Sequence, residues 1–143
     1  YGIDPQGKDK NLKPVLKFGT TLAQIKKIKK GEKIGYDFTF TASKDMVIGI
    51  LPIGYNDGLD RRLSNIGYVS INNTDCRIIG RVSMNIAVID LTKIKNPQAG
   101  VAVEIYSNNT GDKNSISSVA RLCGDIPYNL LVHLKPETKR VID

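Results

Sequence analysis

Three tyrosines in this sequence lie in stretches whose residue types could do chemistry. Tyr36 lies in GYDFTFTA, and Tyr55 opens GYNDGLDRR, in which Arg61 and Arg62 follow a polar turn. Tyr128 lies in DIPYNLL, where a predicted helix begins. An arginine close to a phenol can stabilise the phenolate and lower its pKa from about 10, which is what a tyrosine needs to act as a base. A tyrosine hydroxyl in the first turn of a helix could also reach a bound phosphate.

A fourth stretch, Gly80-Arg81-Val82-Ser83-Met84-Asn85, joins two apolar runs. Small residues beside an arginine and a methionine could present backbone N–H groups to an anion there.

Each of the four places also has a structural interpretation. Most strand tyrosines are packing residues, and Asn56-Asp57-Gly58 is an ordinary turn that solvated arginines can follow. The Gly80 stretch fits a bulged strand crossing, and Tyr128 fits a side chain near a helix start without a ligand. Taken singly, none of these places decides the function.

Short apolar and alternating runs predict about seven strands that position these residues. The expected strands lie in Pro14–Ile28 and at Ile34–Thr41, Asp45–Ile53, Tyr68–Ile71, Arg77–Val82, Ile86–Leu91 and Val101–Tyr106. Pro52 lacks a ladder donor and so indicates an edge or bulge that would re-aim Tyr55. Asn72-Asn73 suits a tight turn between two of the strands.

The C-terminal part changes to helical spacing. Ser115–Cys123 is a predicted helix, which Asn114 or Ser115 can cap and Gly124 can end. Asp125 is expected to cap a second helix, and Lys139–Ile142 is a possible last short strand. The predicted fold class is therefore mainly β, a small β-barrel-like domain with two short helices near the C-terminus.

Composition narrows the class of protein. The 143 residues are 41% hydrophobic and 24% charged, which suits one globular domain. No apolar run approaches the ~20 residues that span a bilayer. Two distant cysteines, Cys76 and Cys123, and a single histidine form no metal-ligand pattern, so the cysteines are expected to be reduced, as in a cytoplasmic protein.

The formal charge of +7 owes much to five lysines between Lys26 and Lys33. Such a cluster could bind nucleic acid, or it could be a solvated strand edge that prevents aggregation. The cluster contains no interleaved aromatic residues, which favours the solvated edge over nucleic-acid binding.

In combination and order, the segments GYDFTFTA, LPIGYNDGLDR, IIGRVSMN and a helix followed by IPYN resemble the C-terminal β-domain of alanine racemase, a pyridoxal-phosphate (PLP) enzyme family. The resemblance runs from Tyr1 to about Tyr128. The chain begins without methionine, and YGIDP looks like the exit of the family's N-terminal domain. We therefore expect a piece of a longer chain, with residues 1–12 as a connector and 13–143 as the β-domain.

The resemblance implies that a missing (β/α)₈ barrel holds PLP through a lysine, and that two chains pair head to tail so that each β-domain closes its partner's active site. Tyr36 matches the catalytic tyrosine, the base on the L-alanine face, with the barrel lysine on the other face. The other matching residues are Tyr55, Arg61 and Arg81 at the substrate entrance, Met84 with its backbone N–H on the substrate carboxylate, and Tyr128 on the PLP phosphate. No metal is expected.

Four positions depart from the family pattern, and the final segment, HLKPETKRVID, matches it poorly. Asp37 follows Tyr36 where the family usually has glycine, and Asn129 stands where glutamate is common. Ser83 and Asn85 stand where the family often has cysteine and aspartate. The base position is kept, so the departures bear on the entrance more than on the reaction class.

The function expected from the resemblance is alanine racemisation by a cytoplasmic homodimer, which supplies D-alanine for peptidoglycan. The isolated piece is expected neither to bind PLP covalently nor to turn over alanine. One alternative is a racemase of another amino acid such as serine. The other is a free-standing basic β-barrel that binds nucleic acid or protein, for which Tyr36 would be buried and the lysines of 26–33 would line up with exposed aromatic residues.

Overall fold

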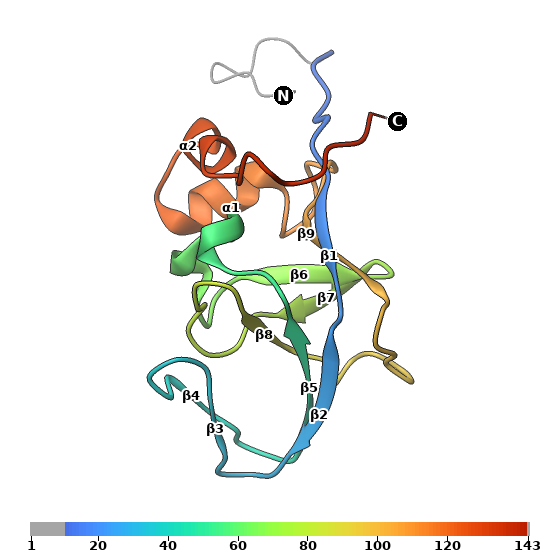
Figure 1. The fold of residues 1–143 in the computed structure, drawn as a ribbon, viewed down its shortest axis with the longest axis vertical. Helices are drawn as coiled ribbons and strands as arrows, with labels where there is room; N and C mark the ends of the chain where they lie inside the picture. The colour runs from blue at the N-terminus through green and yellow to red at the C-terminus, as the bar shows by residue number, and fades with distance from the viewer. Residues whose placement is uncertain (1–10, 143) are drawn as a thin grey trace.

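The structure, a computed structural model, describes residues 11–142 as short antiparallel strands with two helices at one end (Figure 1). A four-stranded sheet has the order β1 (Phe18–Thr21), β9 (Ala102–Tyr106), β6 (Tyr68–Ile71) and β7 (Thr74–Arg77). A three-stranded sheet has the order β2 (Gln24–Ile28), β5 (Met46–Leu51) and β8 (Ala87–Asp90), and β3 (Lys33–Ile34) pairs with β4 (Phe40–Thr41). Two 3-10 turns, η1 (Tyr55–Asp57) and η2 (Arg61–Leu63), precede β6, and helices α1 (Ile116–Cys123) and α2 (Pro127–Val132) follow β9.

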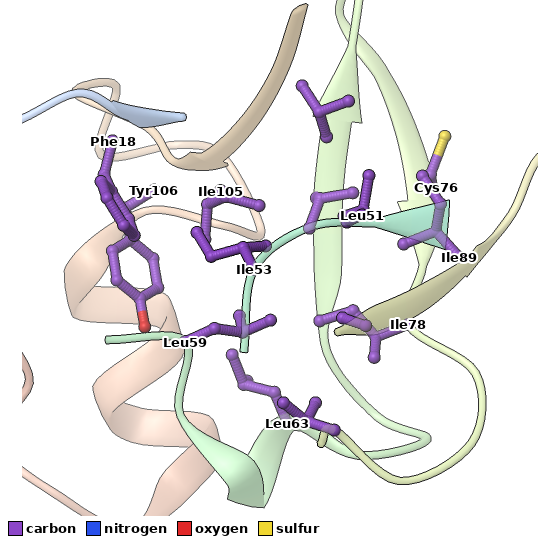
Figure 2. Close-up of a cluster of buried hydrophobic side chains, with 14 of the residues drawn as sticks. Phe18, Leu51, Ile53, Leu59, Leu63, Cys76, Ile78, Ile89, Ile105 and Tyr106 are labelled. Atoms are coloured by element: carbon purple, nitrogen blue, oxygen red, sulfur yellow. The ribbon is translucent and has the colours of Figure 1, made fainter. Parts of the chain in front are cut away.

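The core lies between the sheets and α1, and it includes the tyrosine Tyr106. Tyr106 is fully buried and tilts against Phe18, with 5.7 Å between ring centroids. Its hydroxyl points away from the neighbouring apolar side chains (Figure 2). The hydroxyl donates a 2.7 Å hydrogen bond to the carbonyl of Gly58. Burial raises the pKa of Tyr106, so the hydroxyl stays protonated and remains a donor.

The predicted fold class is confirmed: the chain is mainly strand with two short C-terminal helices. The barrel-like description goes further than the structure, because the strands of residues 11–142 form three separate sheets rather than one closed sheet. The two larger sheets touch through an isolated bridge between Ile78 and Ile89.

Several predicted elements are confirmed. Tyr68–Ile71 is β6, and Asn72 and Asn73 form the turn to β7 with positive φ angles of 47° and 61°. β5, β8 and β9 lie within the runs predicted for them. Pro14–Ile28 was expected to hold one strand, and it holds two, β1 and β2, which belong to different sheets. β5 ends at Leu51, directly before Pro52.

The prediction of one strand over Ile34–Thr41 is wrong. Only its ends pair, as β3 and β4, and the intervening residues form a loop. Gly35, Asp37 and Phe38 have positive φ angles of 83°, 57° and 52°, which no strand can contain. The aromatic alternation therefore marks an exposed loop, in which Tyr36 and Phe38 are 61% and 67% exposed.

The prediction of a strand over Arg77–Val82 is also wrong. The strand that pairs with β6 is Thr74–Arg77, so the strand begins three residues earlier than predicted and ends where the predicted strand was to begin. Gly80 has a φ of 74°, which ends regular pairing, and its N–H bonds the side chain of Asn65 instead of another strand.

At the C-terminal end, helix α1 is confirmed, with the Ser115 hydroxyl accepting from the Ser118 N–H and Gly124 ending the helix at a φ of 64°. Asp125 is not the cap of α2: the N-cap is Ile126, and the Asp125 carboxylate binds Arg62. Lys139–Ile142 forms no strand. The predicted connector, residues 1–12, lies outside the described residues except for its last two.

The lysine cluster lies on and beside β2, which is an edge strand of its sheet. Lys26 and Lys27 are exposed, and Lys29 pairs with Asp45 at 2.8 Å. Charged side chains on such an edge oppose pairing with another chain. Within residues 11–142, no helix has the length and apolar character that crossing a membrane requires.

Candidate functional site

The loop that carries Tyr36 is held against the Gly80 stretch by contact between backbones. Tyr36 and Arg81 form an isolated antiparallel bridge. A Cβ atom on Gly35 would lie 2.6 Å from the Arg81 nitrogen, and one on Gly80 would lie 2.8 Å from the Gly35 Cα. Only glycine fits at both positions, so the close approach fixes the loop while leaving the Tyr36 side chain 61% exposed.

Asp37 adds a side-chain contact to this junction. Arg81 donates from Nη1 to Oδ2 of Asp37 at 2.6 Å, and the two side chains are 37% and 52% exposed. Aspartate tolerates the left-handed backbone conformation that Asp37 adopts here, which suits the position where the family usually has glycine. Asp37, which departs from the family pattern, therefore binds Arg81, one of the predicted entrance arginines.

Asn65 holds the same junction from its other side. Its Oδ1 accepts the Gly80 N–H at 2.7 Å, and its Nδ2 donates to Oγ1 of Thr39 at 3.3 Å. The carbonyl of Asn65 accepts from Nε of Arg77 at 2.9 Å. One amide therefore links the Tyr36 loop to the Gly80 stretch, a role that nothing in the sequence pattern signalled.

The Tyr55 turn packs on the far end of the same stretch. The Tyr55 N–H donates to the Ser83 carbonyl at 3.1 Å, and the Asn56 N–H donates to the Met84 carbonyl at 3.0 Å. A Cβ on Gly54 would lie 2.1 Å from the Ser83 oxygen. The Gly80–Met84 stretch is thus in backbone contact with both tyrosine loops, and Tyr55 and Met84 are 47% and 53% exposed.

The backbone N–H of Met84 is a donor without a partner among residues 11–142. Within the described part of the chain it has no acceptor, although the Met84 carbonyl is used by Asn56. The sequence prediction that this stretch presents an N–H group to an anion remains a prediction, and this donor is the group that could perform it.

The paired arginines have different surroundings. Arg62 ties η2 to the start of α2: it binds Asp60 at 2.6 Å, pairs with Asp125, and donates to the Cys123 carbonyl at 3.2 Å. Arg61 is exposed, and its side chain has no hydrogen bond or ion pair among residues 11–142. The contacts give Arg62 a structural role, whereas Arg61 has no such role among residues 11–142.

The Arg62 cluster shifts the acidity of its two carboxyl groups. Hydrogen bonds from Arg62, then from Asn129 and the Ile126 N–H, lower the pKa of Asp125 to about 2. Burial raises the pKa of Asp60, but the hydrogen bonds and charge of Arg62 outweigh it and the net shift is downward. Both carboxylates remain ionised at neutral pH.

An open depression of about 340 Å³ lies between η1, η2 and α2. Tyr55 and Arg61 line one side of it, and Asn129 and His133 line the other. Asn129, which stands where glutamate was expected, therefore lines the same depression as the predicted entrance residues Tyr55 and Arg61.

Tyr128 lies in a different part of the molecule from Tyr36. It is the second residue of α2, and its side chain is 42% exposed. Figure 1 shows α2 near one end of the long axis, whereas β3 and β4, which flank Tyr36, lie toward the other end. The structure therefore joins Tyr36, Arg81, Met84 and Tyr55 through one backbone stretch and leaves Tyr128 apart.

Neither cysteine side chain belongs to the site. Burial raises the pKa of both the Cys76 and Cys123 thiols to about 11, and both are free. In the part of the chain that the structure describes, no three histidine, cysteine, aspartate or glutamate side chains are grouped to hold a metal ion.

The fold and these loops define an antiparallel β-domain that presents fixed, exposed tyrosines without enclosing them. Residues 15–142 match the family model for the C-terminal domain of alanine racemase, and the chain belongs to that family. It is 40% identical to an alanine racemase of Borreliella burgdorferi over 93% of this chain and 35% of the relative. It is 36% identical to one of Rickettsia bellii over 99% of this chain and 34% of the relative. The chain thus spans about a third of the length of these relatives.

A solved structure shows the same fold. The alanine racemase of Bartonella henselae, determined with covalently bound pyridoxal phosphate, superposes with a TM-score of 0.88 at 34% identity. The match covers 99% of this chain and 39% of that one. The alternative of a free-standing basic binding module required a buried Tyr36, and the exposure of that side chain contradicts it.

Proposed function

We propose that this chain is the C-terminal domain of a PLP-dependent alanine racemase, in which Tyr36 is the base on the L-alanine face. The observation that carries the proposal is that Tyr36 is 61% exposed on a loop fixed by two glycines in backbone contact. The domain holds this side chain in place but does not cover it. Such a side chain is suited to a site that another part of the protein completes.

The residues beside Tyr36 fit a small zwitterionic substrate. The unpartnered N–H of Met84 would bind the substrate carboxylate, as it has no acceptor in residues 11–142. Tyr55, Arg61 and Arg81 would line the entrance, where the exposed guanidinium of Arg61 attracts the carboxylate. Racemisation removes an α-proton from one face and returns one to the other, so Tyr36 needs a second base across the substrate.

The donor groups of this chain fit part of a PLP site. Tyr128 is 42% exposed in the first turn of α2, and its hydroxyl would bind the cofactor phosphate. When bound, PLP supplies the electron sink that stabilises the negative charge left on the α-carbon. Tyr36 would hold the proton on one face, and the covalent attachment and the opposite base would belong to the N-terminal barrel.

The separation of Tyr36 from Tyr128 supports a homodimer with shared sites. α2, which carries Tyr128, and β3 and β4, which flank Tyr36, lie toward different ends of the long axis (Figure 1). This separation favours a site to which two chains each contribute one of the tyrosines. Each β-domain would give Tyr128 to its own chain's cofactor and Tyr36 to its partner's substrate. The enzyme would work in the cytoplasm and supply D-alanine for peptidoglycan.

The test uses the full-length protein with PLP and follows L-alanine conversion to D-alanine, with serine as a second substrate. Tyr36→Phe should lower kcat by about 10²-fold or more. In D₂O it should still exchange the α-hydrogen of D-alanine but lose exchange from L-alanine. Tyr68→Phe is the matched control, since Tyr68 lies on β6 under Lys113. Normal exchange from L-alanine in Tyr36→Phe would refute the assignment of the base.

A further inference from the structure

The backbone on which Tyr36 sits needs support from outside the loop. Asp37 and Phe38 follow Tyr36 with φ angles of 57° and 52°, and two successive non-glycine residues in this region are unfavourable. Phe38 is 67% exposed, so burial of its ring does not offset that cost.

Two side-chain contacts hold the loop directly after Tyr36, one at Asp37 and one at Thr39. Asp37 accepts from the Arg81 guanidinium at 2.6 Å. Thr39 accepts from the Asn65 amide, whose oxygen also accepts the Gly80 N–H. Both contacts end on Gly80–Arg81, the residues whose backbone faces Gly35 and Tyr36.

We propose that Asp37 and Asn65 are positioning residues that together fix the Tyr36 side chain relative to Arg81. The catalytic consequence rests on the proposed function, while the positioning itself does not. Asp37 also carries a negative charge beside the Arg81 guanidinium. It therefore determines the position of the guanidinium and reduces the net positive charge at the entrance.

The expected effects are modest for each contact, because the Asp37–Arg81 pair is partly exposed and the Asn65–Thr39 bond is long. Loss of either should lower kcat roughly two- to fivefold, the range of one exposed ion pair or one neutral hydrogen bond. The KM for alanine should change less than about twofold, since neither residue is expected to touch substrate. Removing both should multiply the two effects if the tethers act independently.

The variants are chosen to keep the backbone conformation. Asp37→Asn removes the charge, and asparagine tolerates positive φ; Asn65→Gly removes the amide at a residue whose φ is 64°. The controls are Asp45→Asn, which breaks the 2.8 Å pair with Lys29, and Asn72→Gly, which makes the same change at another left-handed asparagine.

The measurement uses the full-length protein with fluorotyrosine placed at position 36 and records its ¹⁹F signal, followed by kcat and KM with L-alanine. In Asp37→Asn and Asn65→Gly the signal should shift or broaden and kcat should fall, while both controls match the parent. If Asn65→Gly does not fold, Asp37→Asn decides alone. An unchanged signal and kcat in the folded variants would overturn the proposal. A parent without racemase activity would refute the proposed function, and the ¹⁹F signals would still decide the positioning.

Discussion

The hydroxyl of Tyr106 donates to the carbonyl of Gly58 from a ring that is completely buried. The same oxygen accepts from the Asp60 N–H at 3.4 Å, so the turn between η1 and η2 is attached to β9 through one atom. That turn separates Tyr55 from Arg61, and its place in the fold depends on a core residue 46 positions or more away in sequence.

Tyr106→Phe should therefore destabilise the domain with little change in packing. The Gly58 carbonyl loses its donor, and an unmet buried acceptor costs about 1–3 kcal/mol. Urea unfolding of the 143-residue chain measures the change, with Tyr68→Phe as a control that has no comparable hydrogen bond. Equal stability of Tyr106→Phe and the parent would show that water replaces the lost donor.

Gly54→Ala should disrupt the contact between the Tyr55 turn and Ser83–Met84. The added methyl would lie 2.1 Å from the Ser83 oxygen, and overpacking of this kind costs about 1–3 kcal/mol. The φ of Gly54 is −149°, so the effect is steric and not conformational. Gly111→Ala is the control, because its nearest neighbour would be 3.7 Å away. Comparable unfolding midpoints for the two variants would contradict this account.

Arg62→Gln should raise the pKa of Asp125 from about 2 toward its ordinary value of 3.8. The folded-state pKa is the lower one, so the pairing stabilises the fold above about pH 4 and that stability is lost as pH falls toward 2. The stability difference between parent and variant should accordingly shrink across this window. Carboxylate NMR titration and urea unfolding at several pH values measure both effects.

Arg61→Gln serves as the control for this prediction, since the Arg61 side chain has no hydrogen bond or ion pair among residues 11–142. It should leave the Asp125 titration and the pH dependence of stability as in the parent. An equal effect of the two substitutions would mean that net charge, and not the Arg62 contacts, lowers the pKa.

Both thiols should react slowly with iodoacetamide at neutral pH, because the thiolate is the nucleophile and burial raises both pKa values to about 11. Cys123, which is only partly buried, should react before the fully buried Cys76. Mass spectrometry of the alkylated native chain measures the order. Modification of Cys76 first would indicate that the β7 region opens more readily than α1.

Local signals in the sequence predicted those elements whose ends are fixed by neighbouring residues. Ser115 and Gly124 delimit α1 as expected, and Asn72-Asn73 forms the turn after β6. In these places the capping side chain or the left-handed backbone acts on residues close by in the sequence. The local sequence is therefore sufficient to predict where the helix or turn begins and ends.

The loops around Tyr36 and Gly80 could not be predicted in this way. Alternating aromatic residues indicated a strand over Ile34–Thr41, but the deciding factor is the contact between Gly35 and Gly80, which are distant in sequence. Asn65 is equally hidden, because its partners lie in two other segments. The family resemblance indicated the candidate residues. The contacts that hold their loops in place join segments that are distant in the sequence, so they are seen only in the structure.

The placement of Tyr36 and Tyr128 toward different ends of one domain has a genetic consequence under the proposed function. A chain with Tyr36→Phe would damage its partner's site, and a chain with Tyr128→Phe would damage its own. In a mixed dimer of these two chains, both lesions would fall in the same site, and the other site would be intact. Two alleles that each fail alone should therefore complement one another when they are expressed together.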